Sequence, residues 1–93
     1  MTIRGHILNK AKELTEGNRV DTYGDVNDSM EVFANLLSAQ FGHTYNKTDA
    51  AIIMVLAKLS RIGFSYEHQD NYIDGAAYMA IAGEVSGAFD ATT

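Results

Sequence analysis

Hydrophobic residues recur at helical spacing in the first half of the chain and predict two amphipathic helices there. The first runs from about Ile3 to Glu16, and Gly17-Asn18 is a reasonable C-terminal cap. The second covers roughly Val26 to Phe41 and ends at Gly42. Its apolar stripe consists of Met30, Phe33, Leu37 and Phe41.

Two more helices are expected in the second half. The third starts at Thr48 as N-cap and runs to about Ile62, and because its first turns are apolar on every side we expect it to be the central helix. The fourth spans about Asp70 to Ser86 and is rich in glycine and alanine. Such small residues let two helix backbones approach closely, within the monomer or across a subunit boundary. Residues 87–93 are expected to fray.

Four helices with short connections predict an all-α fold, a small four-helix bundle in a single domain of residues 1–93 with its core in about 3–86. No proline interrupts these helices. A chain of 93 residues has no room for a second core and buries only a modest fraction of its surface. We therefore expect a homo-oligomer.

Composition excludes several classes of function. The chain has no cysteine, which excludes disulfides, thiolate nucleophiles and cysteine-based zinc sites. Its longest apolar stretch, Ala50 to Ala57, is too short to span a bilayer, and its first residues lack a signal-peptide pattern. We therefore expect a cytoplasmic protein without a membrane partner. A net charge of −5 argues against nucleic-acid binding and serves either solubility or metal coordination.

Three carboxylates on the fourth predicted helix are the strongest chemical feature. At 100° per residue, Asp70, Asp74 and Glu84 fall on one stripe. They repel one another unless solvent, a basic side chain or a divalent cation such as Mg²⁺ compensates their charge. The simpler alternative is a solvated face on which Asp70 serves as N-cap.

Lys58 and Arg61 provide counter-charges near the end of the third predicted helix. They lie three residues apart and so share one face. They either complement the helix dipole in a solvated last turn or act as salt-bridge partners or phosphate ligands. Our central structural hypothesis is that this basic end lies against the acidic stripe and that the two enclose a polar pocket.

Two further groups are candidates for binding. Asp28 and Glu31 form a D-x-x-E pair on the second helix, which either is exposed or points with the later carboxylates at a common metal, as in bundle-core sites. In the connection before that helix, Arg19 can contact phosphate, Tyr23 can stack on a base, and Gly24 suits a tight turn. The alternative for this segment is an ordinary interhelical loop.

Three stretches carry a family resemblance: Arg19…Tyr23-Gly24…Asn27, then Lys58-Leu59-Ser60-Arg61-Ile62, then Asp70-Asn71-Tyr72-Ile73-Asp74-Gly75-Ala76-Ala77-Tyr78. They resemble a family of small bacteriophage proteins without a settled function. That family is similar to the nucleotide-modification-associated helical domains and, more remotely, to the all-α nucleoside triphosphate pyrophosphatases of the MazG type. The resemblance covers about residues 5 to 85.

The pyrophosphatase resemblance implies a helical oligomer that binds nucleotides through Mg²⁺ on two motifs, E-x-x-E and E-x-x-D. The nearest matches here are Asp28…Glu31 and either Glu67…Asp70 or Asp70…Asp74. The first begins with Asp instead of Glu, and the second is either offset or one residue too long.

These observations lead to three functional hypotheses. The first is a phage-type protein that binds or sequesters a nucleotide or nucleotide-derived signal of host defence. In this hypothesis Arg19, Lys58 and Arg61 bind phosphate, and Tyr23 contacts the base. Asp70 and Asp74 orient the cations or ligate Mg²⁺. The second is a Mg²⁺-dependent pyrophosphohydrolase that cleaves between the α and β phosphates. The third is a protein inhibitor that docks a helical face on a host enzyme.

Overall fold

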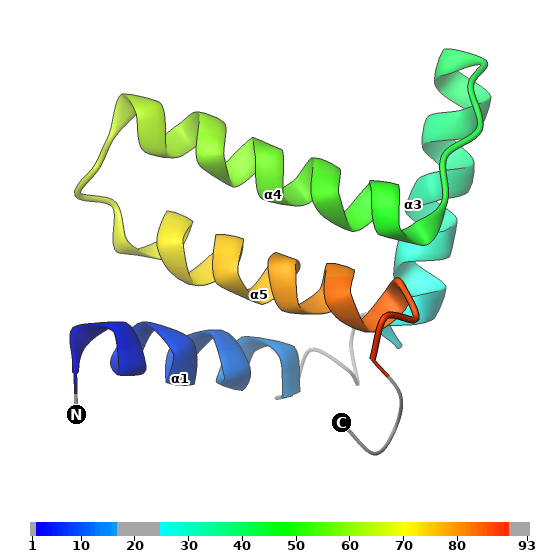
Figure 1. Ribbon diagram of the computed structural model, residues 1–93. Helices are drawn as coiled ribbons and strands as arrows, with labels where there is room; N and C mark the ends of the chain where they lie inside the picture. Colours follow the sequence, from blue (N-terminus) through cyan, green and yellow to red (C-terminus); the bar gives the residue numbers. More distant parts are fainter. Residues whose placement is uncertain (1, 17–24, 90–93) are drawn as a thin grey trace.

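The computed structural model describes residues 2–16 and 25–89, which form four α-helices. These are α1 (Ile3–Glu16), α3 (Val26–Phe41), α4 (Lys47–Phe64) and α5 (Gln69–Val85) (Figure 1). The described part of the chain contains no β-strand. The all-α prediction is therefore confirmed, and each predicted helix is present with ends within two residues of those expected.

The helix ends show which local signals decide the boundaries. Gly42 ends α3 in the left-handed conformation, with φ of 65°, and its N–H donates to the carbonyl of Ser38. The N-cap of α4 is Asn46, not Thr48: its side chain accepts from the N–H of Asp49, and the carboxylate of Asp49 accepts from the N–H of Asn46. This reciprocal pair outcompetes Thr48 because it satisfies two backbone donors at once.

Two other predicted boundaries differ from the structure. His68 is the N-cap of α5 without a side-chain hydrogen bond, so Asp70 lies inside the first turn, where its charge complements the helix dipole. Helix α4 continues through Gly63 to Phe64, since a glycine need not end a helix unless it adopts a left-handed conformation. The proposed cap Gly17-Asn18 lies outside the described residues.

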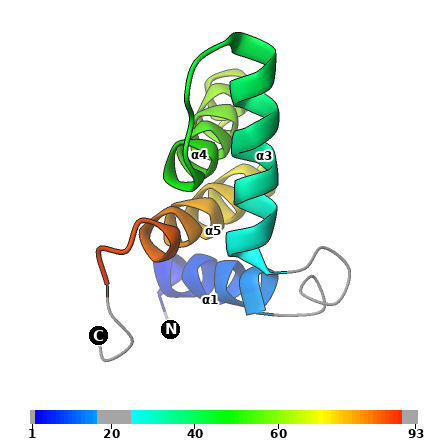
Figure 2. The same cartoon turned by 90° about the vertical axis from the view of Figure 1, so that its right-hand side faces the viewer.

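Three of the helices form a layer, with α5 between α1 and α4 (Figure 1). Helix α3 crosses this layer at the end where α4 begins and α5 ends (Figures 1 and 2). The central helix is thus α5, and the expectation that the third predicted helix is central was wrong. Small side chains on α5, among them Ala77 and Ala82, are buried and let a helix approach on either side.

The hydrophobic core is thin and made mostly of alanine. The buried apolar residues among those described are Ala11, Ala34, Ala50, Ala51, Val55, Ala77 and Ala82. No larger side chain reaches less than 2 % exposure, whereas several are more than half exposed: Leu8, Leu36, Leu56, Leu59 and Met79. The four helices therefore form an open layered arrangement, which leaves much apolar surface uncovered.

The chain folds back after α5. The N–H of Ala88 donates to the hydroxyl of Ser86, and the ring of Phe89 lies 3.5 Å from where a Cβ on Gly83 would be. The tail expected to fray begins at residue 87; Ala88 and Phe89 make these contacts, and residues 90–93 lie outside the described part. Within the described ranges, no helix is both long and apolar enough to cross a membrane.

Candidate functional site

The ammonium of Lys58 on α4 and the carboxylate of Asp74 on α5 form an ion pair, with Nζ 3.2 Å from Oδ2. Their side chains are 13 % and 26 % exposed, so both charges are largely shielded from water. An ion pair in such surroundings is stronger than one at the open surface because solvent screens it less. The predicted meeting of the acidic and basic faces is realised at this pair.

Gly75 allows the two helices to approach closely beside the ion pair. A Cβ built on Gly75 would lie 3.8 Å from the Cβ of Lys58, which is an ordinary van der Waals contact. Any side chain longer than alanine would extend into the space that the stem of Lys58 occupies. The glycine next to Asp74 therefore keeps the ammonium within reach of the carboxylate.

Arg61 and Asp70 extend the same region toward the connection between α4 and α5. Both side chains are exposed, and neither makes an ion pair with another described residue. Arg61 lies one turn beyond Lys58, in the last turn of α4, where its charge complements the helix dipole. The region thus holds one shielded ion pair with a solvent-exposed guanidinium nearby.

Asp28 and Glu31 lie elsewhere. Both are exposed on α3, which crosses the opposite end of α5 from the one where Asp70 lies (Figures 1 and 2). The described residues contain no group of three acidic or histidine side chains that could hold a metal ion. In the described part of the chain, the carboxylates of the two motifs that resemble the pyrophosphatases therefore lie toward opposite ends of α5.

The remaining candidates, Arg19, Tyr23 and Gly24, lie outside the described residues.

At the start of α3, Nζ of Lys47 donates a hydrogen bond of 3.3 Å to Oδ1 of Asn27, a contact that was not predicted from the sequence. A lysine in the first turn of a helix opposes the helix dipole, and this local conflict is a sequence signal for a specific partner. The bond ties the start of α4 to the start of α3.

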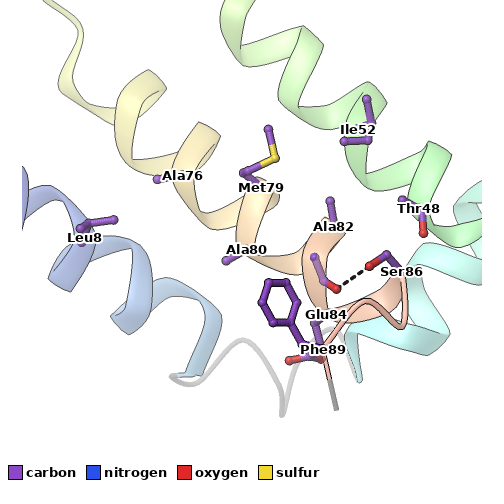
Figure 3. A pocket seen from close by; sticks show the side chains of 11 residues that line it. Leu8, Thr48, Ile52, Ala76, Met79, Ala80, Ala82, Glu84, Ser86 and Phe89 are labelled. Atoms are coloured by element: carbon purple, nitrogen blue, oxygen red, sulfur yellow. Dashed lines mark hydrogen bonds between the residues drawn. The ribbon is translucent and has the colours of Figure 1, made fainter. Parts of the chain in front are cut away.

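An apolar groove runs over α5, with α1 on one side and α4 on the other, and sequence reasoning missed it too (Figure 3). Leu8 of α1 and Ile52 of α4 line its sides, and Met79 and Ala80 of α5 lie between them. Among the described residues that line it, Glu84 alone is charged. The sequence shows these residues to be apolar but does not show that they share one exposed surface.

Comparison with known proteins decides the family. Residues 6–86 match the family described as "Domain of unknown function (DUF6378)". The chain belongs to the DUF6378 family. The chain is also similar to a phage protein, "Gene 55 protein" of Mycobacterium phage L5, to which it is 34 % identical over 76 residues.

That alignment covers 81 % of this chain and 49 % of the phage protein, so the DUF6378 chain spans about half the length of the curated relative it matches. No solved structure matches the chain. The expected membership of a family of small bacteriophage proteins is thereby confirmed. The similarity of DUF6378 to nucleotide-modification-associated domains and to MazG-type enzymes stays a prediction.

Proposed function

We propose that this DUF6378 protein binds a nucleotide or nucleotide-derived signal through its phosphates, at the surface formed by Lys58, Asp74 and Arg61. The observation that carries the proposal is the shielded ion pair, which holds the ammonium of Lys58 in a fixed position 3.2 Å from Asp74. A cation that is already oriented loses less side-chain entropy when an anion binds.

The chemistry of the two cations suits a phosphate. A lysine ammonium has three donors, and Asp74 uses one of them, which leaves the others for phosphate oxygens. Arg61, one turn further along α4, offers a planar fork of donors that matches a phosphate in a bidentate geometry. Asp74 balances the charge of Lys58, and Arg61 adds an exposed guanidinium in a chain of net charge −5.

The remaining parts of the proposal rest on the sequence. Arg19 would add a phosphate contact, Tyr23 would contact the base, and Gly24 would allow a tight turn beside it. Sequestration of a signal of host defence in the host cytoplasm needs binding without turnover, which this arrangement of groups suits. Mg²⁺-dependent pyrophosphate release is the alternative. It would use carboxylates of α3 and α5, and Asp28 and Glu31 lie on a helix at the other end of α5 from Asp70.

Isothermal titration calorimetry of the full chain with ATP, ADP-ribose and a cyclic dinucleotide tests the proposal. At least one of these should bind, and Arg61→Gln should weaken its binding about tenfold or more, since a charge-assisted contact to phosphate contributes about 1.5–3 kcal/mol. The matched control is Lys10→Gln, which removes an exposed cation from α1 that pairs only with Glu13 among the described residues. The proposal is wrong if none of the three probes binds, or if both variants weaken binding equally.

A further inference from the structure

We infer that the apolar groove is the contact face of a homodimer, in which a second copy of the chain seats the same face against it. This inference is independent of the nucleotide proposal, because Lys58, Asp74 and Arg61 do not line the groove. It rests on the shape of the groove, on the surface that the chain leaves exposed, and on the charges at the rim.

The shape of the groove suits a helix. Ala76 and Ala80, on the side of α5 toward α1, are small enough for another backbone to come close, while Met79 projects toward α4 (Figure 3). Met79 is 52 % exposed and Leu8 is 62 % exposed. Shallow small positions beside projecting large ones make a surface that can interdigitate with its own copy about a two-fold axis.

The α4 side of the groove continues as an apolar row. Leu56 and Leu59 follow Ile52 at i+4 and i+7, so all three lie on one face of α4. Leu56 is 56 % exposed and Leu59 is 55 % exposed. The row lengthens the apolar surface along the layer, as a subunit contact between helices requires.

The surface that the single chain leaves exposed suits a subunit contact. Leu8, Ile52 and Met79 in the groove are large apolar side chains and are exposed, as are Leu56 and Leu59 beside it. A standard interface takes about 800 Å² from each partner, and homodimer interfaces are the more apolar class. A second copy seated here would cover apolar side chains that otherwise contact water.

The charges around the groove allow self-association despite the net charge of −5. Arg4 and Lys12 lie one helical turn on either side of Leu8 and so share its face of α1, and both are exposed. Glu84 supplies the opposite charge from α5. A face with basic and acidic groups at different positions can pair them across a two-fold axis, so two copies need not repel there.

The competing apolar face is on α3, where Val32 and Leu36 are 58 % and 64 % exposed. That face is a single helix with Asp28 exposed on its border. Two copies brought together there would place like charges close to one another. The groove is therefore the better contact face.

Sedimentation velocity of the full chain tests the inference. We expect a species of twice the 10.2 kDa chain mass at micromolar concentration. Met79→Glu places a charge in the groove and should raise the dimer dissociation constant at least about 30-fold, as loss of a central interface anchor does. Leu36→Glu, the matched change on α3, should leave the dimer intact.

A conservative variant keeps the test informative if Met79→Glu fails to fold. The chain has no cysteine, so Met79→Cys introduces the only thiol, and a short bis-maleimide should join two copies covalently. Leu36→Cys should give no cross-linked dimer. A wild-type chain that sediments as a monomer overturns the inference, as does a dimer that Leu36→Glu dissociates and Met79→Glu does not, or equal cross-linking of the two cysteine variants.

Discussion

Lys58 and Asp74 form the only ion pair that joins two helices within residues 2–16 and 25–89, with Nζ 3.2 Å from Oδ2. It connects α4 to α5 along the most extensive helix contact of the fold. Because its partners sit at fixed positions on two rigid helices, the pair also sets the register of one helix along the other. Any binding function of Lys58 therefore depends on the same carboxylate that stabilises the fold.

Asp74→Asn should lower the free energy of unfolding by about 1–2 kcal/mol, because it leaves a shielded ammonium without its charged partner. Urea denaturation measures this loss. The double variant Lys58→Met with Asp74→Asn should lose less free energy of unfolding than the two single variants lose together, since it leaves no unpaired charge. The matched control is Glu13→Gln, which breaks the exposed 3.6 Å pair with Lys10 and should change stability by less than about 0.5 kcal/mol. If the losses of the two single variants add up to the loss of the double variant, the Lys58–Asp74 ion pair does not contribute to stability.

Gly75 gives a prediction that separates helix propensity from packing. Gly75→Ala should stabilise the protein by about 0.5–1 kcal/mol, because the added Cβ would make only a 3.8 Å contact with Lys58. Gly75→Leu should destabilise it, because the longer side chain would displace Lys58 from Asp74. At Gly63, where nothing lies within 4 Å of the built Cβ, both changes should be stabilising or neutral. Thermal unfolding followed by circular dichroism measures all four variants, and a stable Gly75→Leu protein would contradict the proposed close approach.

The helices could be predicted from the sequence because their signals are local. Apolar spacing and the glycine after Phe41 fix α3 without reference to the rest of the chain, and Gly42 adopts the expected left-handed conformation. The central position of α5 could not be predicted in the same way. Its alanines and glycines have little hydrophobic periodicity, and only tertiary packing shows that helices contact it on both sides.

The candidate site was predicted in part, for a related reason. Charge complementarity suggested that the basic end of α4 meets the acidic face of α5, and Lys58 meets Asp74 there. Helical spacing could not show that Asp28 lies on a helix crossing the far end of α5, because that depends on the direction of α3. The apolar groove could not be predicted from the sequence, because the exposure of its side chains depends on how the helices pack together and not on any one helix.

The N-cap of α4 provides a test of the observed boundary against the expected one. Asn46→Ala should destabilise the protein by about 1 kcal/mol, because it removes the side-chain acceptor for the N–H of Asp49. Thr48→Ala, at the position expected from sequence, should cost less because Thr48 caps no backbone donor in the structure. Chemical denaturation of the two variants decides between the positions, and a larger loss for Thr48→Ala would favour the boundary predicted from sequence.

The final prediction separates binding from catalysis. We expect the protein to leave ATP and other nucleoside triphosphates intact in the presence of Mg²⁺, with no pyrophosphate released above the uncatalysed rate. The physical reason is the placement of the carboxylates, because hydrolysis by two metal-binding motifs needs the carboxylates of both motifs to converge. In the described part of one chain, Asp28 and Glu31 lie on α3, at the other end of α5 from Asp70. A coupled pyrophosphate assay measures turnover directly.

If pyrophosphate is released, two variants test which carboxylates take part. Asp28→Asn changes an exposed group with no described ion pair, and loss of its charge in the first turn of α3 should cost at most about 0.3–1 kcal/mol. The variant should therefore stay folded but lose turnover if Asp28 takes part in the chemistry. Asp74→Asn lowers stability through Lys58 whether or not catalysis occurs, so its effect on turnover alone decides nothing. Loss of activity in an Asp28→Asn protein that is still folded would therefore establish an enzyme, whereas nucleotide that the wild-type and Asp28→Asn proteins both retain intact would establish a binder.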